Sequence, residues 1–181
     1  MRLTSAVKRH WSLLWAAKFV ARWEGWLPTA YLDTIAQPPV YTQGYGHTKY
    51  AGPPIPPDGT WSKAKGLRVL SRDCRSSAGA VDRYVTHKLS VRQRIALISF
   101  VFNLGPNILP GTDLLAALNR GAFHSAAALM LQYDHGGNGE VVEGLLRRRR
   151  AEAWLMTHPR KKPPVPRRHG DHPHTKAHQR P

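Results

Sequence analysis

The segment from Ser90 to Leu104 constrains the fold most, because it predicts a helix that is apolar almost all the way round. Ser90 suits the N-cap, Ile95-Ala-Leu-Ile and Phe100-Val-Phe supply the apolar residues, and Gly105-Pro106 ends the segment. A helix that is apolar on every side must be buried. We therefore expect a helical domain built around this segment.

Six further segments have helical signals, and they surround a stretch with a different pattern. The expected helices cover about residues 4–24, 62–70, 73–88, 112–119, 123–133 and 141–157. Between residues 30 and 50, Tyr, Thr, Ile and Val alternate with Pro and Gly, which predicts a hairpin with strands at 31–34 and 40–44. The turn falls around Gln37-Pro-Pro, and the proline-rich residues 51–59 predict a loop. These signals predict the α+β class, mostly α.

The charge of the chain is strongly unbalanced. Lys and Arg number 27 against 11 Asp and Glu, which gives a formal net charge of +16 and a pI near 10.8. A surface this basic favours polyanions: nucleic acid, acidic lipid surfaces or the anionic polymers of a bacterial wall. Residues 158–181 are rich in Pro, His, Lys and Arg, and we expect a disordered basic tail there. The expected division is a folded domain at 1–157 and a tail at 158–181.

The single cysteine and the N-terminal segment bear on the cellular compartment. Cys74 has no second cysteine to pair with, so we expect a packed thiol in a protein that folds in a reducing cytoplasm. Lys18 and Arg22 interrupt the first apolar segment, and no run reaches the ~18 apolar residues of a membrane span. We expect the first helix of a mature fold, with no export signal and no transmembrane span.

Because acidic residues are few, candidate catalytic carboxylates can be considered one by one. Glu24 is expected in the last turn of the first helix, where the helix dipole disfavours a negative charge, and between the apolar residues Trp23 and Trp26. Both the dipole and the apolar neighbours favour the protonated, proton-donating form of Glu24. Asp33 follows on the first expected strand, close enough to face Glu24 across a cleft. Glycoside hydrolysis uses such a pair, one carboxyl protonated and the other ionised. On these two residues alone, an ordinary structural role remains the simpler interpretation.

Ordered motifs around the two carboxylates change that interpretation. They are Trp23-Glu-Gly, Ala30-Tyr-Leu-Asp-Thr and Tyr41-Thr-Gln-Gly-Tyr-Gly-His-Thr, followed by residues 93–105, 114–121 and 144–155. Together they resemble the phage-type lysozymes, the muramidase family of phage endolysins, over residues 17–156. The resemblance implies a lysozyme-like fold with an active-site cleft between a small N-terminal β-hairpin lobe and a helical C-terminal lobe. It also implies hydrolysis of the β-1,4 bond between N-acetylmuramic acid and N-acetylglucosamine in peptidoglycan, which lyses the host cell.

The resemblance implies a role for each matching residue. Glu24 would protonate the glycosidic oxygen, and Asp33 would stabilise the oxocarbenium-like sugar and activate the attacking water. Thr42 would hold that water by a hydrogen bond, and His47 would order the hairpin. Arg147 is the best positional match for the arginine that pairs with the catalytic Glu, although the run of four arginines leaves its register open.

Other positions are less decided by the sequence. Ser99 and Asn103 lie one turn apart on the buried helix and match cleft-lining positions, but hydrogen bonding in the interior fits them equally well. The stretch from Asp33 to Thr42 is longer than is common in the family, with the additional residues at 35–39, which puts the placement of Thr42 in question. No cofactor and no metal ion is implied.

Three other functions stay open from the sequence. A nucleic-acid binder would explain the basic tail, but no recognition motif accompanies it. A lytic transglycosylase cuts the same bond with one acid and has no need of Asp33, and a silent wall-binding module needs neither carboxylate. We expect a monomer that binds peptidoglycan in its cleft, anionic wall polymers with its tail, and no specific nucleic acid. It would wait in the host cytoplasm until a holin releases it.

Overall fold

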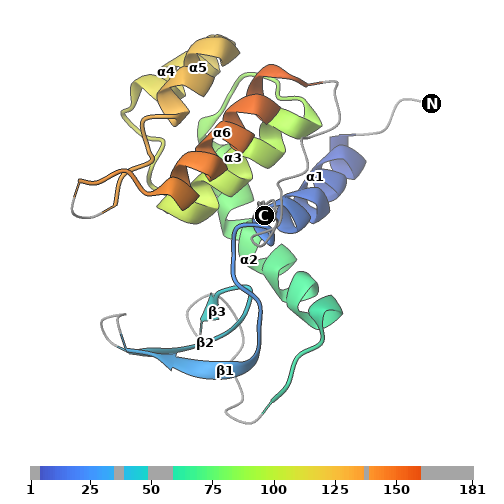
Figure 1. The fold of residues 1–181 in the computed structure, drawn as a ribbon. Helices are drawn as coiled ribbons and strands as arrows, with labels where there is room; N and C mark the ends of the chain where they lie inside the picture. Colours follow the sequence, from blue (N-terminus) through green and yellow to red (C-terminus); the bar gives the residue numbers. More distant parts are fainter. Residues whose placement is uncertain (1–4, 35–38, 49–58, 137–138, 160–181) are drawn as a thin grey trace, which may run out of the picture.

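The computed structural model describes residues 5–34, 39–48, 59–136 and 139–159, and these residues form a helical lobe with a small antiparallel sheet beside it (Figure 1). The expected α+β class, mostly α, is confirmed. The elements follow one another as α1 (Ser5–Val20), β1 (Leu27–Asp33), β2 (Val40–Gly44), β3 (His47–Thr48), α2 (Lys63–Tyr84), α3 (Val91–Leu104), α4 (Asp113–Asn119), α5 (Phe123–Met130) and α6 (Glu143–Thr157).

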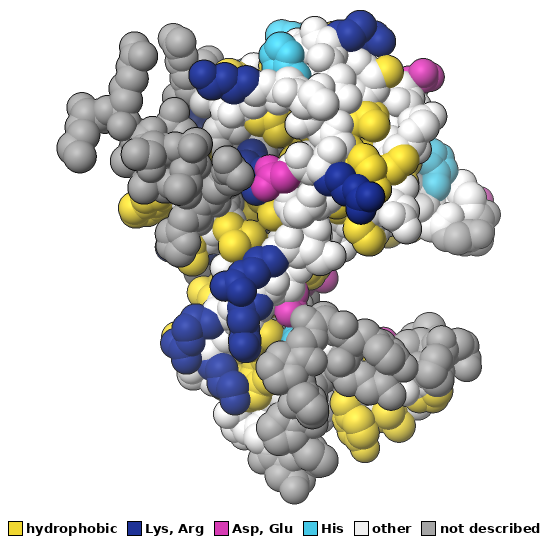
Figure 2. All heavy atoms as spheres, turned by 180° about the vertical axis from the view of Figure 1, so that it is seen from behind, with side chains coloured by type: hydrophobic (Ala, Val, Ile, Leu, Met, Phe, Trp, Pro, Cys, Tyr) yellow, Lys and Arg dark blue, Asp and Glu magenta, His cyan; other side chains and the backbone are white. Residues whose placement is uncertain are grey.

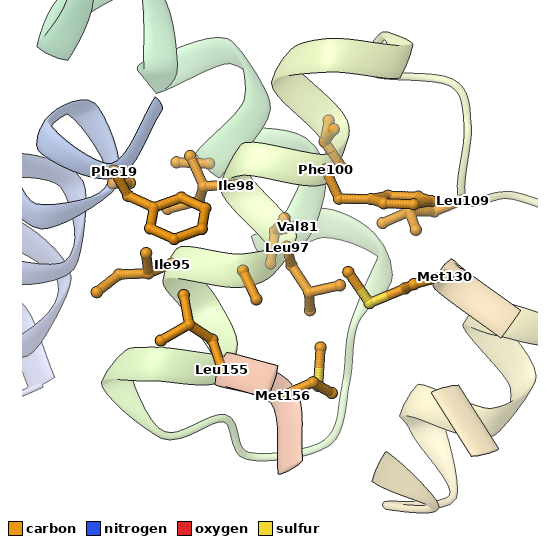
Figure 3. Close-up of a cluster of buried hydrophobic side chains, with 14 of the residues drawn as sticks. Phe19, Val81, Ile95, Leu97, Ile98, Phe100, Leu109, Met130, Leu155 and Met156 are labelled. Carbon is orange, nitrogen blue, oxygen red and sulfur yellow. The ribbon is translucent and has the colours of Figure 1, made fainter. Parts of the chain in front are cut away.

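Helix α3 is the centre of the helical lobe, as its sequence predicts. Ser90 caps it, and its hydroxyl accepts a hydrogen bond from the backbone N–H of Gln93, whose side chain bonds back to the Ser90 N–H. Leu97 and Ile98 are fully buried, and each contributes about 1.5–3 kcal/mol through burial. Figure 3 shows side chains of α1, α2, α5 and α6 packed around this helix.

Helix α1 has the expected helical period, but a different face is buried. Ala16, Phe19 and Val20 face the core. By contrast, Trp11 and Trp15, which belong to the apolar series in the sequence, are 49% and 47% exposed. The buried side of α1 packs against α3, and this contact determines which face of the helix is inside.

Helix α2 is one continuous helix, whereas the sequence predicts two helices at 62–70 and 73–88. No Gly or Pro stands between these two segments, so nothing in the backbone chemistry ends the first one. The hydroxyl of Ser62 caps the start by accepting from the N–H of Lys65 at 3.2 Å. Gly66 lies directly against the Trp26 ring, and a side chain there would overlap it. The helix extends from the helical lobe toward the sheet (Figure 1).

The sheet has the order β1-β2-β3 and contains one strand more than the sequence predicts. Strand β1 pairs with β2 so that Tyr31 lies opposite Thr42 and Asp33 opposite Val40. Strand β3 is short and pairs with β2 through a tight turn. Gly44, the last residue of β2, and Gly46, in the turn, have φ angles of +70° and +76°. Such angles favour glycine, so these two residues make the turn that the hairpin prediction did not include.

Other expectations are met in part or lie outside the described residues. The last helices are shorter than expected, since α5 ends at Met130 and α6 begins at Glu143. Cys74 is a fully buried free thiol in the core, as predicted. Most of the expected hairpin turn, most of the loop at 51–59 and residues 160–181 of the expected tail lie outside the described residues. None of the described helices is long and apolar enough to span a membrane.

Candidate active site

Glu24 lies in the turn between α1 and β1, where the helical lobe meets the sheet. Its backbone N–H still donates to the carbonyl oxygen of Val20, the last residue of α1, at 3.2 Å. Glu24 therefore stands just beyond the helix rather than in its last turn. Its side chain is 26% exposed.

Glu24 pairs with Arg148 of α6. The guanidinium Nη1 donates to Glu24 Oε1 at 2.8 Å, and the Arg148 side chain is 4% exposed. The residue that the sequence suggested, Arg147, is about half exposed and lies 3.7 Å from Glu143. The prediction for Arg147 was wrong by one residue, because four consecutive arginines do not reveal which one faces inward. Arg148 therefore fixes the position of the Glu24 carboxyl group.

A buried polar network contacts Arg148 on the side that faces the core. Glu152 is fully buried, lies 3.3 Å from Arg148 Nε and 3.0 Å from Arg149 Nε, and accepts from the Ser99 hydroxyl at 2.6 Å. Asn103 accepts from Arg149 Nη2 at 2.9 Å. Ser99 and Asn103 thus bond within the interior, which was one of the two alternatives for them. Burial raises the pKa of Glu152, and it lowers the pKa of Arg149.

Asp33 and Thr42 lie on neighbouring strands and on the same side of the hairpin. Thr42 is paired with Tyr31, two residues before Asp33, and side chains two residues apart on a strand share a face. Asp33 is half-buried and Thr42 is buried. Among the described residues the Thr42 hydroxyl has no hydrogen-bond partner. A buried hydroxyl of this kind is available to a bound molecule.

The β2–β3 turn brings the sheet to Glu24. A Cβ atom built on Gly46 would lie 3.9 Å from Glu24 Oε2, so the backbone of this turn passes beside the carboxyl group. His47 anchors the turn from the other side, since its Nδ1 lies 2.9 Å from Asp73 Oδ2 of α2 and both side chains are nearly buried. Burial raises the pKa of Asp73, and its contact with His47 lowers it in part. His47 therefore joins the hairpin to α2.

Comparison with known proteins identifies the family. The model of the phage lysozyme family matches residues 21–152. The chain belongs to the phage lysozyme family. Endolysin of Salmonella phage P22 is 32% identical over 136 residues, which are 75% of this chain and 90% of the relative. The crystal structure of a P22 lysozyme mutant is similar with a TM-score of 0.68 and 27% identity, and the match covers 86% of this chain and 98% of that chain.

Some family members are much longer than the region they share with this chain. Endolysin of Bacillus phage B103 is 34% identical over 116 residues, which are 64% of this chain but 43% of the relative. The chain therefore spans less than half of that protein. The family model covers the part of this chain that contains Glu24, the hairpin and most of α6.

Three residues around the site of this phage lysozyme were missed in the sequence: Arg148, Glu152 and Asp73. For α6 the helical spacing selects the inward residues only once one buried position of the helix is known. Counting back from buried Met156 by four and by eight residues gives Glu152 and Arg148, which therefore lie on the inward side. For Asp73 no such signal exists, because its partner His47 is distant in the sequence and the two meet only in the folded chain.

Proposed function

We propose that this member of the phage lysozyme family is an endolysin, a glycoside hydrolase that cleaves the β-1,4 bond between N-acetylmuramic acid and N-acetylglucosamine in bacterial peptidoglycan. The observation that carries the proposal is the placement of Glu24. Its carboxyl group is anchored by Arg148 and partly exposed, and it lies beside the turn of the hairpin that holds Asp33 and Thr42. A carboxyl on each side of a glycan is the arrangement that glycoside hydrolysis requires.

In this mechanism Glu24 protonates the oxygen of the leaving sugar. Asp33, on the opposite side of the sugar ring, stabilises the oxocarbenium-like transition state and activates the attacking water. The hydroxyl of Thr42, which has no partner among the described residues and lies on the same side of the hairpin as Asp33, holds that water by a hydrogen bond. Arg148 fixes the orientation of the Glu24 carboxyl, and His47 with Asp73 keeps the hairpin in place against α2.

The test compares wild type with Glu24→Gln and Asp33→Asn on outer-membrane-permeabilised bacteria. Turbidity loss measures lysis, and mass analysis of the released fragments identifies the new ends. We expect both variants to lose lysis, with hydrated reducing ends in the wild-type digest. Loss in Glu24→Gln alone, with anhydro ends, would instead identify a lytic transglycosylase. No lysis by a folded wild type would leave a wall-binding module.

We infer that residues 1–157 form the catalytic domain and that the basic residues 158–181 hold the enzyme on anionic wall polymers. Opposite charge supports this, because the tail contains Asp171 as its one acidic residue. Truncation after Thr157 should leave cleavage of small soluble glycans intact and weaken lysis of whole cells, most clearly at low salt. Equal lysis of whole cells with and without the tail would contradict the anchoring role.

We further propose that the protein acts as a monomer and waits in the host cytoplasm until a holin releases it to the wall. The endolysin names of its relatives support a role in phage lysis. Expression with and without a membrane-permeabilising protein, followed by cell fractionation and turbidity measurement, tests the release step. Lysis without any such protein would contradict it.

A further inference from the structure

The exposed side of α1 contains large apolar side chains that no other described element covers. Trp11, Leu14 and Trp15 are 49%, 40% and 47% exposed. Their spacing of three and one residues places them on one side of the helix, opposite the buried Ala16 and Val20. An apolar patch of this kind on a small domain commonly marks a binding surface.

Cations continue the same side of the helix. Lys18 lies over the Trp15 ring, with Nζ 5.0 Å from the ring centroid, and Arg22 follows one turn later and is exposed. Lys18 falls on the side of Trp11 and Trp15 by helical spacing, and Arg22 stands in the turn that follows the helix. The sequence of α1 contains no acidic residue. This side of α1 is therefore aromatic at one end and positively charged at the other.

Helix α2 packs against α1 and adds a second set of cations. Arg68, Arg72 and Arg75 follow at steps of four and three residues, so they form one exposed stripe. Figure 2 shows a group of Lys and Arg side chains beside the narrow part of the molecule, between its upper and lower parts. The acidic residues of α2 are engaged elsewhere, since Asp73 pairs with His47 and Asp82 with Arg94.

We propose that the exposed side of α1 together with the arginine stripe of α2 binds the surface of an anionic lipid bilayer. We call this surface the aromatic-basic face, defined by Trp11, Leu14, Trp15, Lys18, Arg22, Arg68, Arg72 and Arg75. Trp rings insert at the level of lipid headgroups, where their apolar body and polar N–H both find a suitable environment. Lys and Arg beside them bind anionic headgroups. The enzyme would thereby be held at a membrane surface.

Two other occupants fit the face less well. A second copy of the chain would bring two molecules of net charge +16 together, which opposes association. A nucleic acid would engage the arginines and could stack on the Trp rings, but it leaves the branched apolar side chain of Leu14 without a partner. A lipid bilayer uses both the apolar and the charged residues.

The test measures co-sedimentation of the full chain with large unilamellar vesicles, either pure phosphatidylcholine or a mixture with phosphatidylglycerol. We expect binding to the anionic vesicles, weakened by salt, and little binding to the neutral ones. One variant removes the arginines: Arg68→Gln/Arg72→Gln/Arg75→Gln. It should bind at least about tenfold more weakly, given roughly fivefold per lost arginine at a membrane surface. The apolar variant, Trp11→Gln/Leu14→Gln/Trp15→Gln, should also bind at least about tenfold more weakly. Brominated lipids should quench Trp fluorescence in wild type and much less in the Trp variant.

Two control variants remove the same number of side chains from other surfaces. Val141→Gln/Val142→Gln/Leu131→Gln removes three exposed apolar residues, and Arg120→Gln/Arg147→Gln/Arg150→Gln removes three exposed arginines. Both should bind nearly as wild type does, because they lie outside the aromatic-basic face. Circular dichroism and thermal unfolding establish that every variant is folded.

The outcomes are distinct. Equal weakening by the control variants would overturn the proposal, because net charge or general hydrophobicity would then explain binding. Absence of binding to anionic vesicles would also overturn it, as would binding confined to a single-stranded oligonucleotide. The proposal does not depend on the proposed enzymatic activity, since the vesicles contain no glycan. Glu24→Gln should bind vesicles as wild type does, so a failure of the catalytic proposal remains distinguishable.

Discussion

Arg148 Nη1 lies 2.8 Å from Glu24 Oε1, and this contact joins α6 to the turn that follows α1. The two residues are far apart in the sequence, so the ion pair exists only when both ends of the described chain are folded together. On its other side, Arg148 Nε is 3.3 Å from the buried carboxyl of Glu152. One guanidinium thus connects a partly exposed carboxyl in the candidate site to a buried one in the core.

We predict that Arg148→Gln is strongly destabilising, whereas Arg147→Gln is nearly neutral. Removing one partner of a buried ion pair costs about 3–5 kcal/mol. Most of this cost comes from the contact with buried Glu152, because Glu24 is partly solvated. Arg147 is exposed, and a surface change of this kind stays within about 0.5 kcal/mol. Urea unfolding of the two variants measures the difference. Similar free energies of unfolding would show that Arg148 contributes no more than a surface arginine.

Glu152→Gln should also destabilise the protein, and its cost should depend on pH. Burial raises the pKa of Glu152 above its ordinary value of 4.5, even with two arginines beside it. Just above pH 4.5, the native state therefore holds a proton that the unfolded state has released, so this group's contribution to stability falls as pH rises. The difference in unfolding free energy between wild type and variant should shrink from pH 4.5 to 7. A difference that grows with pH would mean that the arginines keep Glu152 ionised.

Two glycines of α2 should respond to alanine in opposite directions. A Cβ atom on Gly66 would overlap the Trp26 ring, whereas a Cβ atom on Gly79 has nothing within 4 Å. Gly66→Ala should therefore cost about 1–3 kcal/mol through overpacking. Gly79→Ala should stabilise by about 0.5–1 kcal/mol, because alanine loses less backbone entropy in a helix. Thermal unfolding measures both, and a stabilising Gly66→Ala would show that Trp26 moves aside freely.

The parts of the fold that could be predicted are those with a local chemical signal. The capping box at Ser90 and the apolar residues of α3 specify that helix and its burial, and both were confirmed. The exposed face of α1 was not predictable from its period, because both sides of the helix contain apolar residues: Trp11 and Trp15 on the exposed side, Phe19 and Val20 on the buried side. Contact with α2 and α3 in the folded chain decides between the two sides.

In the candidate site, the residues that belong to a recognisable motif could be predicted. The choice between neighbouring residues of the same type could not, because only the folded packing determines it. Glu24, Asp33 and Thr42 follow a spacing that can be read along the chain, although their catalytic roles stay predictions. The choice between Arg147 and Arg148 depends on the rotation of α6 about its axis, which is set by the packing of Met156 and its neighbours. The pairing of His47 with Asp73 depends on where α2 contacts β3 in the folded chain.

Cys74 should be unreactive in the native protein. Its side chain is fully buried, and burial raises the pKa of its thiol to about 12. The thiolate is the form that reacts with alkylating reagents, so at pH 8.5 the native protein offers almost none of it, whereas an unfolded chain offers a large fraction. Iodoacetamide labelling, followed by mass spectrometry, should modify the protein only when urea unfolds it. Labelling at pH 8.5 that is fast and independent of urea would show that α2 opens locally at Cys74 without global unfolding.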